Sequence, residues 1–165
     1  MSVSPPTLLK GIYNTIKATG RKAISSDATM MVHGLPDMVW HIKQFPWPIL
    51  SSAGEIEQPM PLGSAGWTPQ QTKTYMQGPI MLSETVEGRV QTFMEWLLNN
   101  GGEFNATAYE GVPDAHTWSY PMIGCMITLD QPDRDWENRA QLLNISGTMF
   151  YHYFGDRARG TLPIV

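Results

Sequence analysis

The chain has little charge and almost no cysteine, and both shortages limit what it can do. Only 16% of its 165 residues are charged, and its formal net charge is −4. This acidic balance argues against tight nucleic-acid binding, which requires lysine and arginine to displace the counterions of phosphates. Cys125 is the single cysteine, so an intrachain disulfide and a cysteine-based metal cluster are excluded.

Long apolar runs and targeting signals are also missing. No stretch reaches the roughly 18 apolar residues of a transmembrane helix, so we expect no contact with a membrane. The N-terminus lacks the long apolar core and the cleavage pattern of a secretory signal. These absences predict a chain that folds in a reducing cytoplasm.

Motifs for catalysis and metal binding are absent as well. The sequence contains no phosphate loop, no Gly-x-Ser-x-Gly elbow and no His-Glu-x-x-His. Asp130, Asp133 and Asp135 lack the central glycine and distal glutamate of a calcium loop, and Cys125 lies on the apolar side of its expected strand. Four histidines are scattered without the spacing of metal ligands: His33, His41, His116 and His152. We therefore expect no enzymatic activity, no metal site and no cofactor.

The stretch from Thr72 to Asn100 carries the strongest structural pattern. Thr72–Gln77 alternates as a strand does, and Gly78-Pro79 should kink it. A helix should run from Ser83, its expected N-cap, to Asn100, because apolar residues recur there at helical spacing. The face expected to pack on the rest of the domain consists of Val86, Val90, Phe93, Met94 and Leu97.

Most of the remaining chain alternates like β-structure. The last two expected strands, Trp118–Leu129 and Leu142–Phe154, should pair antiparallel because a charged connection joins them. Ile123 and Cys125 should share the apolar face of the first. The other expected strands are Thr29–His33, Val39–Phe45 and Phe104–Tyr109. The pattern predicts one domain over residues 1–165, with one helix packed on β-structure.

Two segments are more apolar than surface segments usually are. Residues 1–28 form an N-terminal arm with a short helical pattern, and residues 46–69 form a long loop rich in proline and tryptophan. The prolines exclude a regular central strand from the loop, although residues 54–58 could form a short one. Both segments should lie against a surface, either of the same subunit or of a neighbour. The residues expected at a subunit interface are Leu8, Ile12, Ile16, Trp47, Leu50 and Trp67.

The order of elements over residues 29–154 resembles the tail tube proteins of contractile-tailed bacteriophages. The resemblance rests on the turn at Gly34-Leu35-Pro36, the stretch Pro59–Gly63 and the helical aromatic pair Phe93 and Trp96. It also rests on the Tyr-rich last strand that follows Gly147. It implies an antiparallel β-sandwich or half-barrel with one flanking helix, which closes into a ring barrel when six copies assemble.

The same resemblance implies a function. The rings would stack into the inner tube of a contractile phage tail, through which DNA passes during ejection. The partners would be further copies of the chain, the sheath and tape-measure proteins, and the baseplate and tail-terminator proteins of the virion. Asn144, Ser146 and Thr148, the polar face of the last strand, would face the lumen.

Two alternatives remain open from the sequence. One is a related tube-initiating baseplate protein or a tail-terminator protein with the same fold. The other is a small monomeric β-fold ligand-binding protein or enzyme, with a pocket near His116 or Cys125.

Overall fold

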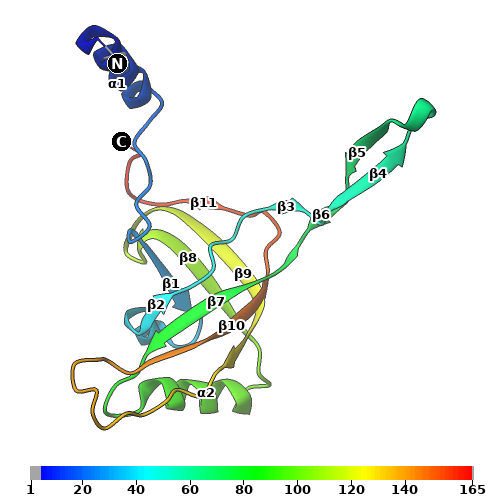
Figure 1. The fold of residues 1–165 in the computed structure, drawn as a ribbon. Helices are drawn as coiled ribbons and strands as arrows, with labels where there is room; N and C mark the ends of the chain where they lie inside the picture. Colours follow the sequence, from blue (N-terminus) through cyan, green and yellow to red (C-terminus); the bar gives the residue numbers. More distant parts are fainter. Residues whose placement is uncertain (1–4, 165) are drawn as a thin grey trace.

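A computed structural model describes residues 5–164 as a nearly closed, barrel-like antiparallel sheet with two α-helices (Figure 1). The strands of the main sheet lie in the order β1, β8, β9, β10, β7, β2, and β11 pairs with β9. The prediction of a mainly β, antiparallel half-barrel with a flanking helix is confirmed. The strand bounds are β1 Ala28–Val32, β2 Ile42–Gln44, β7 Tyr75–Ser83, β8 Phe104–Val112, β9 Ala115–Leu129, β10 Asn144–His152 and β11 Ala158–Arg159.

The long strand β9 belongs to both halves of this sheet. It pairs with β8 on one side, and on the other side it pairs with β10 through Ile123–Leu129 and with β11 through Trp118 and Ser119. The expected antiparallel pairing of the last two long strands is therefore confirmed. Because one strand serves both halves, the sheet curves around a single core.

A β-bulge at Gly124 changes which side chains of β9 reach this core. Along β8, Phe104 pairs with Cys125 but Ala106 pairs with Met122, so β9 contains one extra residue. Gly124 has a φ of 58°, a conformation that favours glycine. The prediction that Ile123 shares the buried face of Cys125 is wrong, because the bulge turns Ile123 outward and Met122 inward.

The helix α2 (Arg89–Asn99) covers one end of the barrel. Val90, Phe93 and Leu97 are buried, and Met94 packs against the core beside them. The Phe93 ring meets Phe104 of β8 edge-to-face, at a centroid distance of 6.0 Å. The buried residues that the barrel adds are mostly aliphatic or small, among them Met30, Val32, Ile80, Leu82, Ala106, Ala108, Met122, Cys125 and Met149.

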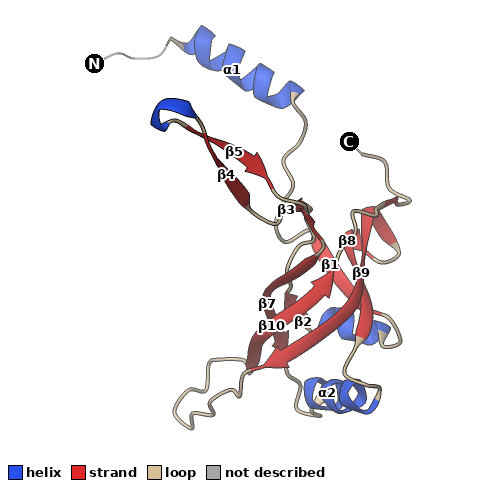
Figure 2. Ribbon diagram, turned by 90° about the vertical axis from the view of Figure 1, so that its right-hand side faces the viewer, coloured by secondary structure: helices blue, strands red, loops and turns tan. Residues whose placement is uncertain are grey.

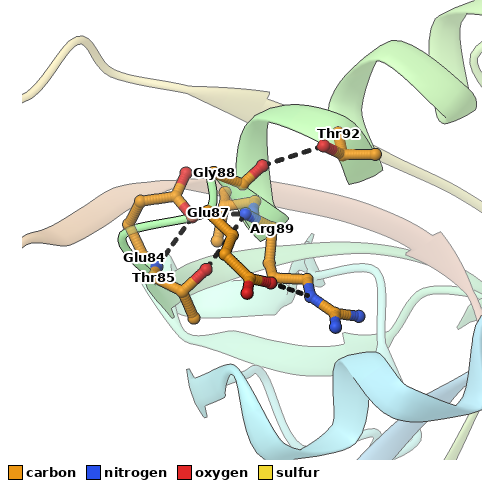
Figure 3. Close-up of polar contacts among 7 residues, drawn as sticks. Glu84, Thr85, Glu87, Gly88, Arg89 and Thr92 are labelled. Atoms are coloured by element: carbon orange, nitrogen blue, oxygen red, sulfur yellow. Dashed lines mark hydrogen bonds and ion pairs between the residues drawn. The ribbon is translucent and has the colours of Figure 1, made fainter.

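The helix begins five residues later than the sequence pattern predicts. Ser83 is the last residue of β7, and Gly88 occupies the N-cap position with a φ of 76°. The carboxylate of Glu84 accepts hydrogen bonds from the backbone N–H groups of Val90 and Gln91, at 2.9 and 3.1 Å, and so takes over the capping role. It also accepts one from the backbone N–H of Thr85 at 2.8 Å, in the turn that leads into the helix (Figure 3). Val86 lies in the loop before the helix and is fully exposed, so its assignment to the packing face is wrong.

Two other strand predictions are corrected by the structure. β7 continues through Gly78 and Pro79 without the expected break. β2 pairs with β7 only near Met81 and Leu82, so at Pro79 one side of β7 is an unpaired edge, where a proline is tolerated. The strand predicted at Val39–Phe45 begins later, at Ile42. Its first two residues, Val39 and Trp40, belong instead to a 3-10 helix, η1 (Pro36–Trp40), which follows directly from the Gly-Leu-Pro turn.

Two elements project from the end of the barrel opposite α2 (Figures 1 and 2). One is the helix α1 (Pro6–Ala18), which forms much of the expected arm of residues 1–28; residues 1–4 of that arm lie outside the described residues. The other is a hairpin of β4 (Glu55–Pro59) and β5 (Ala65–Pro69), with the short 3-10 helix η2 (Pro61–Gly63) at its tip. β3 (Ser51–Ser52) and β6 (Thr72–Lys73) pair at its base. The segment predicted as a long loop is thus largely an ordered hairpin.

Replacing Phe93 with alanine tests the packing of α2. We expect Phe93→Ala to lower the free energy of unfolding by about 3–5 kcal/mol, because it empties a buried aromatic site. Val86→Ala, a matched control at the exposed position before the helix, should change it by less than about 0.5 kcal/mol. Urea denaturation followed by circular dichroism measures both, and equal losses would mean that α2 does not pack as described.

The Glu84 cap makes stability depend on pH. Burial alone raises the pKa of this carboxyl, but the backbone N–H groups of Val90, Thr85 and Gln91 outweigh it and hold the pKa below its usual value. The cap therefore stabilises the fold above the unfolded pKa, near 4.5, and its contribution is lost as the pH falls further.

We expect Glu84→Gln to cost about 0.5–2 kcal/mol at pH 7 and to flatten the loss of stability below pH 5. Glu87→Gln makes the same charge change at an exposed neighbour and serves as the control. Denaturant titrations at a series of pH values give both curves. Identical acid slopes for Glu84→Gln and the wild type would contradict the capping role.

Candidate assembly surfaces

The projecting helix α1 has no buried side chain. Its apolar residues are spaced i, i+1, i+4, i+5 and i+8, which places them on one face of the helix. Each of them is roughly half exposed: Leu8, Leu9, Ile12, Tyr13 and Ile16. This apolar face, which includes the three α1 residues predicted at a subunit interface, is uncovered in the single chain.

The projecting hairpin is equally uncovered. Every residue of β4 is exposed, and Trp67 of β5 is 70% exposed opposite Glu57. Met60 and Leu62 are exposed near the tip. Trp67 is therefore available to another molecule, as its predicted interface role requires, and that role stays a prediction.

Trp47 differs from Trp67, although both come from the same Pro-rich segment. Its ring lies edge-on to Tyr120 of β9 at a centroid distance of 5.0 Å, and it packs partly buried against the core. The aromatic contact of Trp47 is thus within its own subunit, and its predicted interface role stays a prediction. Leu50 is partly exposed near Gly155 and remains a candidate.

The outer face of β7 and β10 carries no lysine, arginine, aspartate or glutamate. Of the three residues predicted to line a lumen, Ser146 is exposed, whereas Asn144 and Thr148 are half-buried. The Asn144 Oδ1 atom is buried and lacks a hydrogen-bond partner within residues 5–164. Phe150 follows on the same strand, paired with Gln77 and Met126. This face is neutral and mixes polar with apolar groups.

The α2 end of the barrel has an apolar surface of its own. Trp40 and Val86 are exposed beside a shallow depression that they line together with Asp37, Glu87 and Arg89. The connection between β9 and β10 adds Trp136, which is 94% exposed, and Leu142. Large apolar groups are thus exposed at both ends of the molecule.

The groups that could perform chemistry are held apart or buried. Cys125 is fully buried, and burial raises the pKa of its thiol to about 12. His33 Nε2 is 2.7 Å from Thr107 Oγ1, and His116 Nδ1 is 3.0 Å from the Pro113 carbonyl, so both rings have structural partners. Over residues 5–164, no group of three potential ligands could hold a metal ion, and neither described helix is long and apolar enough to cross a bilayer.

A groove of about 1200 Å³ opens between the linker after α1, the end of β2 and the β8–β9 turn. It includes Ala115 and Thr117, on either side of His116, but not Cys125. Its lining includes the charged side chains of Arg21, Lys22, Asp27, Lys43 and Glu110, but neither histidine nor cysteine. The predicted alternative placed a pocket near His116 or Cys125, and neither of these residues lines the groove.

No model of a known protein family matches the sequence, and no curated protein matches it.

Solved structures do match the fold. A chain of the PVC sheath–tube complex, an extracellular contractile injection system in its extended state, has a TM-score of 0.57 at 11% identity, covering 88% of this chain and 97% of that chain. The tube-terminating cap of the anti-feeding prophage gives 0.52 at 13% identity, over 85% and 93%. A chain of the anti-feeding prophage baseplate also gives 0.52, at 11% identity, over 84% and 95%.

The chain has the fold shared by these contractile-tail components. The predicted resemblance to tail tube proteins is therefore confirmed at the level of the fold. All three neighbours belong to tail assemblies, and this contractile-tail fold is held at very low sequence identity. At this identity, the likeness shows a shared backbone arrangement.

Sequence patterns missed several exposed groups of this contractile-tail fold. Tyr13 completes the α1 face; it directly follows Ile12 and could have been found by extending the helical spacing by one residue. Trp136 had a weaker signal, namely a single tryptophan inside a charged connection. Of the hairpin, the short strand allowed at residues 54–58 corresponds to β4, whereas its partner β5 was missed because the prolines around it marked a loop.

The state of Cys125 provides a test against covalent chemistry. Native protein at pH 8 should react with iodoacetamide about 1000-fold more slowly than urea-unfolded protein, because the thiol is buried and little thiolate forms. Mass spectrometry of timed samples measures both rates. Labelling of the native protein as fast as that of the unfolded chain would reopen Cys125 as a nucleophile.

Proposed function

We propose that the chain is a structural subunit of a contractile tail, with copies that form hexameric rings and stack into the inner tube. The observation that carries this proposal is α1, a helix of 13 residues without a buried side chain. Helices of this length are marginal in water on their own, and they gain most of their stability from packing. A second copy supplies the missing contact surface. The fold shared with PVC and anti-feeding prophage components supports a tail as the setting.

Ring formation also accounts for the open edges of the barrel. β1 and β2 each pair with only one strand, so each presents a free edge to a neighbour. A contact that places one subunit beside the next by rotation closes into a ring and covers such edges. The sheets of the copies then form one continuous barrel around a lumen.

We propose that the neutral face of β7 and β10 lines this lumen, with Asn144, Ser146 and Thr148 on it. A wall without lysine or arginine gives phosphates little to bind, which suits the passage of DNA during ejection. The partners in this role are a tape-measure protein inside the tube, a sheath protein outside it, and baseplate and terminator proteins at its ends. The particle is a virion assembled in the host cytoplasm.

A second candidate is a tube-terminating cap or a tube-initiating baseplate protein. The fold matches a cap chain and a baseplate chain of the anti-feeding prophage at the same TM-score of 0.52, which favours this candidate over unrelated functions. The two candidates differ in growth. A tube subunit polymerises without a length limit, whereas a cap stops at one ring.

Serine substitutions on the α1 face test the proposal. Purified wild-type protein should form rings and tubes, visible by negative-stain microscopy and by sedimentation. The triple variant Leu8→Ser, Ile12→Ser, Ile16→Ser should keep the circular dichroism and melting temperature of the barrel, because none of these side chains is buried. Its assembly should require more than tenfold higher protein concentration, since each apolar side chain buried at an interface contributes about 1.5–3 kcal/mol.

Thr7→Ser with Asn14→Ser changes the polar side of the same helix and serves as the control. It should assemble as the wild type does. A wild-type chain that stays monomeric at high concentration would refute the proposal, and unchanged tubes from the triple variant would remove α1 from the interface.

A further inference from the structure

Two surfaces at opposite ends of the molecule carry charge of opposite sign. α1 and the linker after it, residues 5–26, contain cations and no acidic residue: Lys10, Lys17, Arg21 and Lys22. The connection from β9 to β10, residues 130–143, lies at the α2 end and has an excess of acids over Arg134 and Arg139 (Figure 2). Its acids are Asp130, Asp133, Asp135 and Glu137.

None of these charges is neutralised within the chain. Over residues 5–164 the structure contains one ion pair, between Arg89 Nε and Glu87 Oε2 at 3.6 Å. Asp135 accepts a hydrogen bond from the backbone N–H of Glu137, which holds the turn but supplies no counter-charge. The cations of α1 and the acids of the connection therefore remain available to another molecule.

Each charged surface also includes exposed apolar groups. On α1, Lys10 and Lys17 stand three residues before and four residues after Tyr13, so both flank its exposed ring. On the connection, Trp136 lies between Asp135 and Glu137 and is 94% exposed. An apolar centre with charged groups at its margin is the usual composition of a protein interface.

We propose that α1 of one copy docks on the 130–143 connection of a second copy, and that this contact joins successive rings. The inference rests on the proposed tube function and specifies which two surfaces meet. The hairpin is the other projecting element, but it carries Glu55 and Glu57 and no cation over residues 51–71, so the acidic connection repels it. Of the two projecting elements, α1 therefore has the charge that complements the acidic connection. Because the contact is head-to-tail, each stack keeps a free α1 surface at one end and a free connection at the other, to which further rings can bind.

Charge reversal with reciprocal rescue tests the pairing. Lys10→Glu with Lys17→Glu should lower the pelletable tube fraction at least about tenfold, and Asp133→Lys with Asp135→Lys should do the same, because like charges then face each other. The chain that combines all four substitutions should recover tubes to within about twofold of the wild type. Rings should persist in every variant.

The hairpin provides the matched control. Glu55→Lys with Glu57→Lys reverses the same number of acidic charges on the other projecting element. It should not rescue Lys10→Glu with Lys17→Glu. Rescue by the hairpin variant, or no effect of the α1 and connection variants on a wild type that forms tubes, would overturn the inference and leave the tube function standing.

Cysteine cross-linking gives a second measurement that does not depend on tube yield. Cys125 is buried, so introduced cysteines react without competition. After oxidation with copper phenanthroline, a chain with Lys17→Cys and Asp135→Cys should give a ladder of disulfide-linked multimers on a non-reducing gel. The reason is that α1 and the 130–143 connection lie at opposite ends of one copy and meet only between copies (Figure 2).

The single substitutions should give dimers at most. A ladder from Lys17→Cys with Glu57→Cys, and none from Lys17→Cys with Asp135→Cys, would show that α1 docks on the hairpin and would overturn the inference. A wild type that stays monomeric would refute the tube function itself, and the pairing with it.

Discussion

The fold depends on the pairing of one strand, β9, with both halves of the sheet. β9 pairs with β8 on one side and with β10 and β11 on the other. The two halves of the sheet therefore meet along β9, and the sheet curves there to form the barrel. The bulge at Gly124 lets Met122 and Cys125, three residues apart, both point inward. Without that extra residue, one of the two would leave the core, because side chains alternate strictly along a regular strand.

This arrangement separates the chain into a packed body and uncovered projections. The body buries its apolar groups under α2 and within the barrel, while α1 and the hairpin extend from the opposite end with theirs exposed. Such exposure is costly for a lone chain in water. It is what a subunit presents when assembly completes its surface, and it agrees with the fold shared with contractile-tail components.

The few charged residues of the chain are unevenly distributed in the structure. The strands β7 and β10 carry none of it, and the acids and cations gather in the connections and projections at the two ends. Neutral strands suit close contact and a smooth wall. The basic α1 and the acidic 130–143 connection have charge of opposite sign, which suits the directional contact between copies proposed above.

The sequence by itself determined the features that depend on local periodicity. The alternation of β10, the helical face around Phe93 and the apolar stripe of α1 were all readable from spacing, and so was the absence of catalytic motifs. Tertiary structure decided the rest. The bulge that exposes Ile123 and the contact of Trp47 with Tyr120 each require a partner distant in sequence. The Glu84 cap that delays α2 past Val86 spans only six residues, but it depends on the packed position of the helix. Spacing along the chain specifies which face a side chain shares, but only the packed neighbours decide whether that face is covered.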